Sequence, residues 1–193
     1  MLRHVFLLRR LLPGLGLGLV LWWFWPRSPT PKTAGGPQVI TVFVEDPWRT
    51  FSAIQLHQRR PGSILVMQGS PRFQEINYRQ LVRYGQWPPE MKPPVILTAG
   101  CDTFGQLTTL ALWLSDQPVR GDVTIVTSPA HLGRAVAIGR IVLGSLGWSV
   151  TGFAAATGDN RPETLLRTLR DQIRAQIWRS TRWNPIPVNR PCL

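Results

Sequence analysis

Residues 123–134 read Val-Thr-Ile-Val-Thr-Ser-Pro-Ala-His-Leu-Gly-Arg, and this stretch decides the fold. The run from Val123 to Thr127 is apolar and β-branched, which is typical of a strand buried on both faces. Ser128 and Pro129 then carry the signals of a helix start. Because ligands of α/β proteins bind where a strand turns into a helix, the stretch predicts both a fold class and the position of a site.

The same strand-then-helix pattern recurs along the chain. Strands are expected at residues 39–44, 63–68, 94–98, 123–127 and 149–154. Helices are expected at residues 48–59, 71–84, 103–116, 130–146 and 162–178. Strict alternation predicts a three-layer, Rossmann-like parallel sheet of about five strands with helices on both faces. The turns that follow the first four strands should then meet at one edge of the sheet.

The N-terminal segment differs in composition from the rest of the chain. Residues 11–25 form an uncharged run of 15 residues, rich in leucine and tryptophan and preceded by three arginines. We expect residues 1–25 to be a signal anchor or transmembrane helix, although a full span needs roughly 20 residues. The tryptophans suit a membrane interface, and no small-x-small cleavage site follows, which favours an anchor over a removed signal peptide. Residues 26–37 read as a Pro-rich linker, 38–183 as the domain and 184–193 as an irregular tail.

Basic residues before the apolar run predict a single-pass plasma membrane protein with its domain outside the cytoplasm. Arg27 and Lys32, on the other side of the run, reduce this asymmetry. The whole chain has 22 Lys and Arg against 10 Asp and Glu, a net charge of +12. Its partners are therefore an anionic or phosphorylated small molecule, a lipid headgroup or nucleic acid, unless the charge only solubilises the surface. Nucleic acid is disfavoured because no recognised binding module occurs and the domain is expected to be exported.

Metal and nucleotide motifs do not stand out. Cys101 and Cys192 form neither a zinc cluster nor a disulfide framework, although a single bridge between them is conceivable. His4 and His57 lack ligand-like neighbours, so no metal site is predicted. Neither Gly-x-Gly-x-x-Gly nor a Walker sequence is present, and a cofactor is not indicated.

The strongest candidate site is the fourth turn, with Ser128, His131 and Arg134. A helix N-terminus, an imidazole and a guanidinium together suit a phosphate or a carboxylate, and a histidine and an arginine one turn apart would both face the ligand. The alternative is structural: Ser128 caps the helix, His131 is solvated and Arg134 pairs with a surface acid.

Other turns offer further polar groups. Asp102 and Thr103 lie at the start of the third helix. One interpretation is that they only cap this helix, and the other is that they line the site, with Asp102 orienting His131. A hydrolytic triad of Ser128, His131 and Asp102 is conceivable, but no Gly-x-Ser-x-Gly elbow supports it. Glu45 and Asp46 follow the first strand and are either acid/base carboxylates or a solvated charge and a cap.

The last expected helix carries leucines and isoleucines on one face and arginines elsewhere. An amphipathic, arginine-rich helix of this kind rests on anionic lipid or packs its leucine face on the sheet. The second arrangement is the more common, and we expect it here.

Residues 127–135, Thr-Ser-Pro-Ala-His-Leu-Gly-Arg-Ala, resemble the T-S-x-x-H-x-x-R-A signature of the DUF218 domain family (YdcF/SanA/ElyC-like). Residues 102–106 are similar to that family's N-T-x-E-N segment, and Arg49 matches an arginine at the start of its first helix. The resemblance covers roughly residues 38–178. It implies a Rossmann-like domain, often behind one membrane segment, in bacterial envelope biogenesis and lipid-carrier metabolism, with S-adenosylmethionine binding in one branch.

Carried over by position, the resemblance places Thr103, Ser128, His131 and Arg134 in the pocket. The family's glycine-rich first turn is Val-Glu-Asp-Pro at residues 44–47 here, its second Gly-Gly is Gly-Ser at 69–70, and its Glu-Asn is Gly-Gln at 105–106. These departures disfavour S-adenosylmethionine and leave open whether the protein is an enzyme.

Together, these features predict a membrane-anchored domain that binds a phosphorylated or anionic ligand in cell-envelope (peptidoglycan or lipid-carrier) biogenesis. The candidate ligand-binding residues are Thr103, Ser128, His131, Arg134, Asp102 and Arg49. The alternative is a non-catalytic envelope scaffold that uses its basic surface for lipid or protein contact.

Overall fold

A computed structural model describes residues 35–88, 90–100, 102–157 and 163–183. The expected anchor, nearly all of the linker, the tail and both cysteines lie outside these residues. None of the helices in the described part is both long and apolar enough to cross a membrane.

The fold is an α/β fold built on one five-stranded parallel sheet, as the alternating pattern predicts. Its strands, in spatial order, are β3 (Val95–Thr98), β2 (Ile64–Gly69), β1 (Gln38–Phe43), β4 (Asp122–Thr127) and β5 (Ser149–Ala154). The central strand β1 pairs in parallel with β4, with Val39 opposite Val123 and Val42 opposite Val126. This pairing brings the ends of β1 and β4 side by side, although the two strands are far apart in the sequence.

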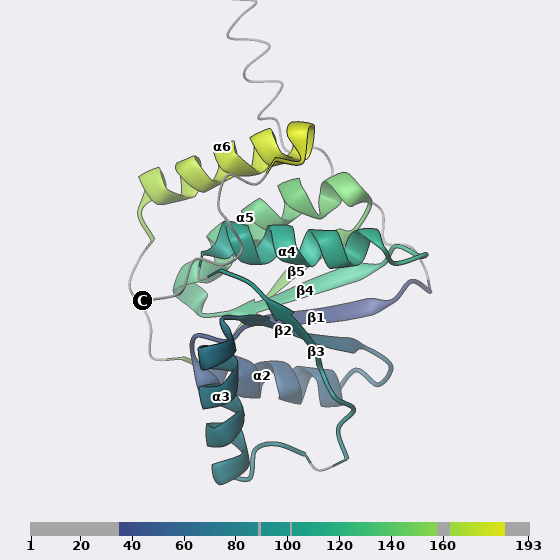
Figure 1. Ribbon diagram of the computed structural model, residues 1–193, viewed down its shortest axis with the longest axis vertical. Coiled ribbons are helices and arrows are strands. Elements are labelled where there is room, and N and C mark those ends of the chain that lie inside the picture. The colour runs from purple at the N-terminus through teal and green to yellow at the C-terminus, as the bar shows by residue number, and fades with distance from the viewer. Residues whose placement is uncertain (1–34, 89, 101, 158–162, 184–193) are drawn as a thin grey trace, which may run out of the picture.

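Helices cover both faces of the sheet (Figure 1). One face carries α2 (Pro47–Gln58) and α3 (Pro71–Arg83), and the other carries α4 (Thr103–Ser115) and α5 (Pro129–Val142). A 3₁₀ turn, Gly144–Leu146, follows α5, so the single helix expected at residues 130–146 is interrupted. The chain therefore forms the three layers expected from its sequence.

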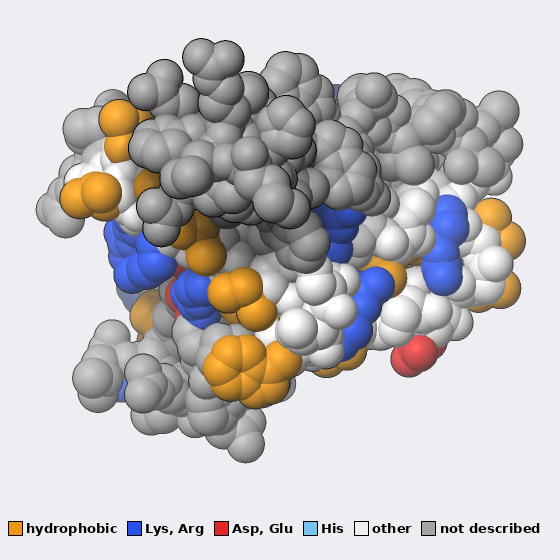
Figure 2. Space-filling view, turned by 90° about the horizontal axis from the view of Figure 1, so that it is seen from above, with side chains coloured by type: hydrophobic (Ala, Val, Ile, Leu, Met, Phe, Trp, Pro, Cys, Tyr) orange, Lys and Arg blue, Asp and Glu red, His pale blue; other side chains and the backbone are white. Residues whose placement is uncertain are grey.

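The last helix, α6 (Leu165–Thr181), begins later than expected and forms an additional outer layer on α5 and α4 (Figure 1). Its buried side chains are Asp171, Ala175, Gln176 and Trp178. The expectation that its leucine face packs on the sheet is therefore wrong. The inner position is taken by Asp171, because this carboxylate pairs with an arginine of α5. Seen from this side, hydrophobic and basic side chains are visible between the residues drawn in grey (Figure 2).

Two apolar cores hold the layers together. Phe104, Leu107, Ile138 and Trp148 are fully buried between the sheet and the α4–α5 layer. On the opposite face of the sheet, a second core joins Ile40 of β1 to Ile54 of α2 and Leu81 of α3. Burial on this scale fixes the strand ends, and with them the side chains of the site.

Gly139 fixes the position of α5 against the sheet. A Cβ atom built there would lie 2.8 Å from Ile125 Cδ1 and 3.1 Å from Val150 Cγ1. Glycine therefore lets the helix approach β4 and β5 closely, which sets where the side chains of its first turn lie.

Candidate functional site

The candidate site begins where β1 and β4 end next to each other. Arg49, in the first turn of α2, donates from NH2 to Ser128 Oγ over 3.2 Å, and both side chains are buried. Ser128 makes no side-chain cap to α5, whereas the side chains of Asp46, Ser70, Asp102 and Thr164 cap α2, α3, α4 and α6. Ser128 therefore stands at the N-cap position of α5, as the sequence predicts, but its hydroxyl accepts from Arg49 instead of capping the helix.

Glu45 lies beside Arg49 at the end of β1. Its Oε1 accepts from Gln106 Nε2 and its Oε2 is 3.6 Å from Arg49 NH1, while 25 % of the side chain stays exposed. Burial raises the pKa of Glu45, although hydrogen bonds from the backbone and Gln106 and the charges of Arg49 and His131 act in the opposite direction. Glu45 is therefore not a solvated surface charge, whereas Asp46 is the expected helix cap.

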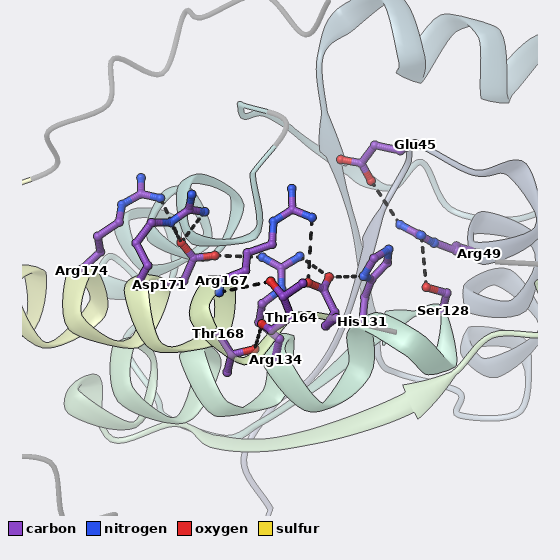
Figure 3. A network of polar contacts seen from close by, with 12 residues as sticks. Glu45, Arg49, Ser128, His131, Arg134, Thr164, Arg167, Thr168, Asp171 and Arg174 are labelled. Atoms are coloured by element: carbon purple, nitrogen blue, oxygen red, sulfur yellow. Dashed lines mark hydrogen bonds and ion pairs between the residues drawn. The ribbon is translucent and has the colours of Figure 1, made fainter. Parts of the chain in front are cut away.

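His131, in the first turn of α5, lies between two groups of side chains (Figure 3). Its Nδ1 is hydrogen-bonded to Glu163 Oε1 on one side. On the other side lie Glu45 and Arg49, and the electrostatic effect of His131 reaches Glu45. A carboxylate on one ring nitrogen fixes the orientation of an imidazole, and 23 % of the His131 side chain is exposed.

Arg134, one turn further along α5, is held by two of the protein's own carboxylates. Its NH2 lies 2.7 Å from Glu163 Oε1 and its NH1 lies 2.9 Å from Asp171 Oδ2. The side chains of Arg134, Glu163 and Asp171 are only 8 %, 9 % and 0 % exposed, respectively. We interpret Arg134 as a positioning residue, and its direct contact with a ligand stays a prediction.

Glu163 joins His131 to Arg134. Burial by itself would raise the pKa of Glu163, but hydrogen bonds and charge from Arg134 and His131 outweigh this effect and lower it. The carboxylate thus stays ionised to a lower pH than an ordinary glutamate. It occupies the position between His131 and Arg134 where the sequence suggested an anion.

The network continues along α6 (Figure 3). Asp171 Oδ1 accepts from Arg170 Nε over 2.9 Å and from Arg174 NH1 over 3.3 Å. Arg174 also lies 3.7 Å from Asp102 Oδ1 and stacks 4.3 Å above the Phe104 ring. These contacts attach α6 to the start of α4.

Asp102 and Thr103 lie at the start of α4, at the edge of this network. Asp102 Oδ1 accepts from the Gly105 amide over 2.7 Å, so it caps its own helix, and Thr103 is buried as the first residue of α4. The carboxylate that orients His131 is Glu163 rather than Asp102. With Ser128 bonded to Arg49, the residues considered for a hydrolytic triad do not form one.

Of the predicted site residues, the structure joins Arg49 to Ser128, and His131 to Arg134 through Glu163. Sequence reasoning missed Glu163, Asp171 and Arg174, which all come from the segment after β5. One signal in the sequence could have indicated these residues. The chain has only 10 Asp and Glu against 22 Lys and Arg, and a buried arginine needs a carboxylate partner, so each acid was a candidate partner of an arginine. In the described part, no three His, Cys, Asp or Glu residues are placed to hold a metal ion.

Comparison with family models, curated proteins and solved structures gives no significant match. The resemblance of residues 127–135 to the DUF218 signature therefore remains a proposal based on those residues.

Proposed function

We propose that the domain binds a phosphorylated or otherwise anionic ligand at the carboxyl edge of its sheet. Arg49 and His131 would contact the anion, with Glu45 beside them and Ser128 and Glu163 as positioning residues. In keeping with the DUF218-like motif and the apolar N-terminal run, the ligand would belong to envelope biogenesis in a membrane-anchored protein.

The observation that carries this proposal is the convergence of Arg49 and His131 from two different helices. Each is fixed by a buried partner, Ser128 for the guanidinium and Glu163 for the imidazole. Each also lies in the first turn of its helix, where the helix dipole favours negative charge. Donor groups that are already held in place bind an anion without the cost of ordering flexible side chains, which supports a binding site over a merely basic surface.

Thr103, Asp102 and Arg134 have different roles in this proposal. Arg134 holds Glu163, and thereby His131, in place. Asp102 is a helix cap whose side chain stays 32 % exposed, so a ligand that extends across the sheet edge can reach it. Chemistry on the ligand is not required for any of these roles.

We expect Arg49→Gln to weaken binding of a phosphate monoester about ten-fold, because one charged hydrogen bond is lost. The affinity is measured by isothermal titration calorimetry of the full chain. The ligands are phosphate monoesters, nucleotides, polyprenyl-phosphate headgroup analogues and S-adenosylmethionine. His131→Ala should weaken binding similarly, whereas Arg83→Gln, at the exposed end of α3, should not. Unchanged affinity in both site variants, with intact folding, would favour the envelope scaffold that lacks a ligand site.

Binding should also weaken as the pH rises through the pKa of Glu45. Burial raises this pKa, so the group stays neutral to a higher pH than an ordinary glutamate. Once ionised, the carboxylate repels an anion held by Arg49. Glu45→Gln should remove this part of the pH dependence in calorimetric titrations, and an unaltered pH profile would contradict the placement of the anion next to Glu45.

A further inference from the structure

The outer face of α6 is an apolar stripe with no partner among the described residues. It consists of Leu165, Leu166, Leu169, Ile173 and Ile177, which are between 40 % and 87 % exposed. Four of them repeat every four residues, which aligns their side chains along one side of a helix. The buried side chains Asp171, Ala175 and Trp178 lie on the opposite side and attach α6 to the body of the domain.

The charge around this apolar stripe is positive. Arg170 borders the stripe, one turn from Leu166 and Ile173, and Arg167 lies one turn from Arg170 on the side of Glu163. The two side chains are 59 % and 55 % exposed, respectively. The only acidic residue within α6 is Asp171, which is fully buried. The exposed surface of the helix therefore combines apolar side chains with arginines and presents no acid.

Charge complementarity decides what covers the apolar stripe. A second copy docked through its own α6 would bring the same arginines against each other with no acid between them. The chain's own residues 1–34 contain five Lys and Arg and no Asp or Glu, so they would repel these arginines as well. An anionic lipid bilayer supplies both an apolar interior and a negative surface.

We propose that α6 lies in the plane of an anionic lipid bilayer, with the apolar stripe inserted at the level of the headgroups. The uncharged run at residues 11–25 would bring the domain to that bilayer and make docking an intramolecular step. This inference concerns a surface outside the ligand site and does not depend on a ligand.

The test introduces Leu169→Cys into the full chain, in a background with Cys101→Ser and Cys192→Ser, and attaches a nitroxide label to the new cysteine. A matched label at position 79 reports on α3, on the opposite side of the sheet, where Arg79 is 75 % exposed. Both proteins are reconstituted into nanodiscs of phosphatidylcholine alone or mixed with phosphatidylglycerol. We expect phosphatidylglycerol to increase the collisions of the label at position 169 with oxygen and to reduce those with a polar nickel reagent, while the label at position 79 does not respond.

Two variants separate the apolar and electrostatic contributions. Leu165→Gln together with Leu166→Gln should abolish the response at position 169, and the fold should tolerate both because these side chains are the most exposed of the stripe. Arg167→Gln and Arg170→Gln should each weaken docking about five-fold. An equal response in both lipid mixtures, or dipolar broadening between labels of two copies, would overturn the proposal. The latter outcome would identify a second copy as the occupant.

Discussion

Arg134→Gln is expected to lower the free energy of unfolding by about 3–5 kcal/mol. The arginine neutralises Glu163 and Asp171, whose side chains are 9 % and 0 % exposed. Removing the guanidinium leaves two buried carboxylates with weaker compensation, which costs far more than the loss of a surface ion pair. Urea denaturation followed by circular dichroism measures the change.

Arg167→Gln is the matched control. Arg167 also contacts Glu163, at 3.9 Å, but its side chain is 55 % exposed, so stability should change by less than about 0.5 kcal/mol. Arg134→Lys should restore only part of the loss, because an ammonium does not reproduce the two-pronged geometry of a guanidinium. Equal stability of the Arg134→Gln and Arg167→Gln variants would contradict a buried network centred on Arg134.

Glu163→Gln is expected to destabilise the fold by about 2–3 kcal/mol at neutral pH and yet to raise the affinity for a phosphate monoester. Stability falls because Arg134 loses a charged hydrogen bond. Affinity rises because glutamine keeps an oxygen that can hold the His131 ring in place, while the negative charge behind the ring no longer repels the anion. A purely structural glutamate would not show these opposite effects.

The pH dependence of stability provides a second readout for Glu163. Because the pKa of Glu163 is lowered in the folded protein, its carboxylate stabilises the fold above the ordinary glutamate pKa. That contribution is lost as the pH falls through the lowered pKa. Glu163→Gln should therefore lose less stability on acidification than the parent, while Glu75→Gln, an exposed control on α3, should behave like the parent. An affinity for the monoester that falls in Glu163→Gln would contradict the proposed position of the anion.

The fold was predictable because it depends on local patterns. Runs such as residues 123–127 are β-branched and apolar, which indicates strands. Asp46, Ser70 and Asp102 are residue types that favour the N-cap position, and each caps the helix that follows it. Strict alternation of the two patterns leaves few topologies other than a parallel sheet with helices on both faces. The order β3-β2-β1-β4-β5 required the structure, because pairing between β1 and β4 is non-local.

The site was only partly predictable, for a related reason. Arg49, Ser128 and His131 stand out because they lie at strand ends and helix starts. Glu163 and Asp171 meet Arg134 only because α6 packs on α5, and no periodicity in either helix encodes that contact. The orientation of α6 was mispredicted because a leucine stripe normally faces the core, whereas ion pairing of Asp171 turns the opposite side inward.

The proposed ligand site is tested most directly by nuclear magnetic resonance of the histidine rings in the full chain during titration with a phosphate monoester. His57 is an internal control, because its Nδ1 is bonded to Ser63 next to the start of β2, away from the carboxyl edge. We predict saturable shifts of the His131 ring that weaken in Arg49→Gln, with no change at His57. Shifts of equal size at both rings, or none at His131, would contradict an anion site at the carboxyl edge of the sheet.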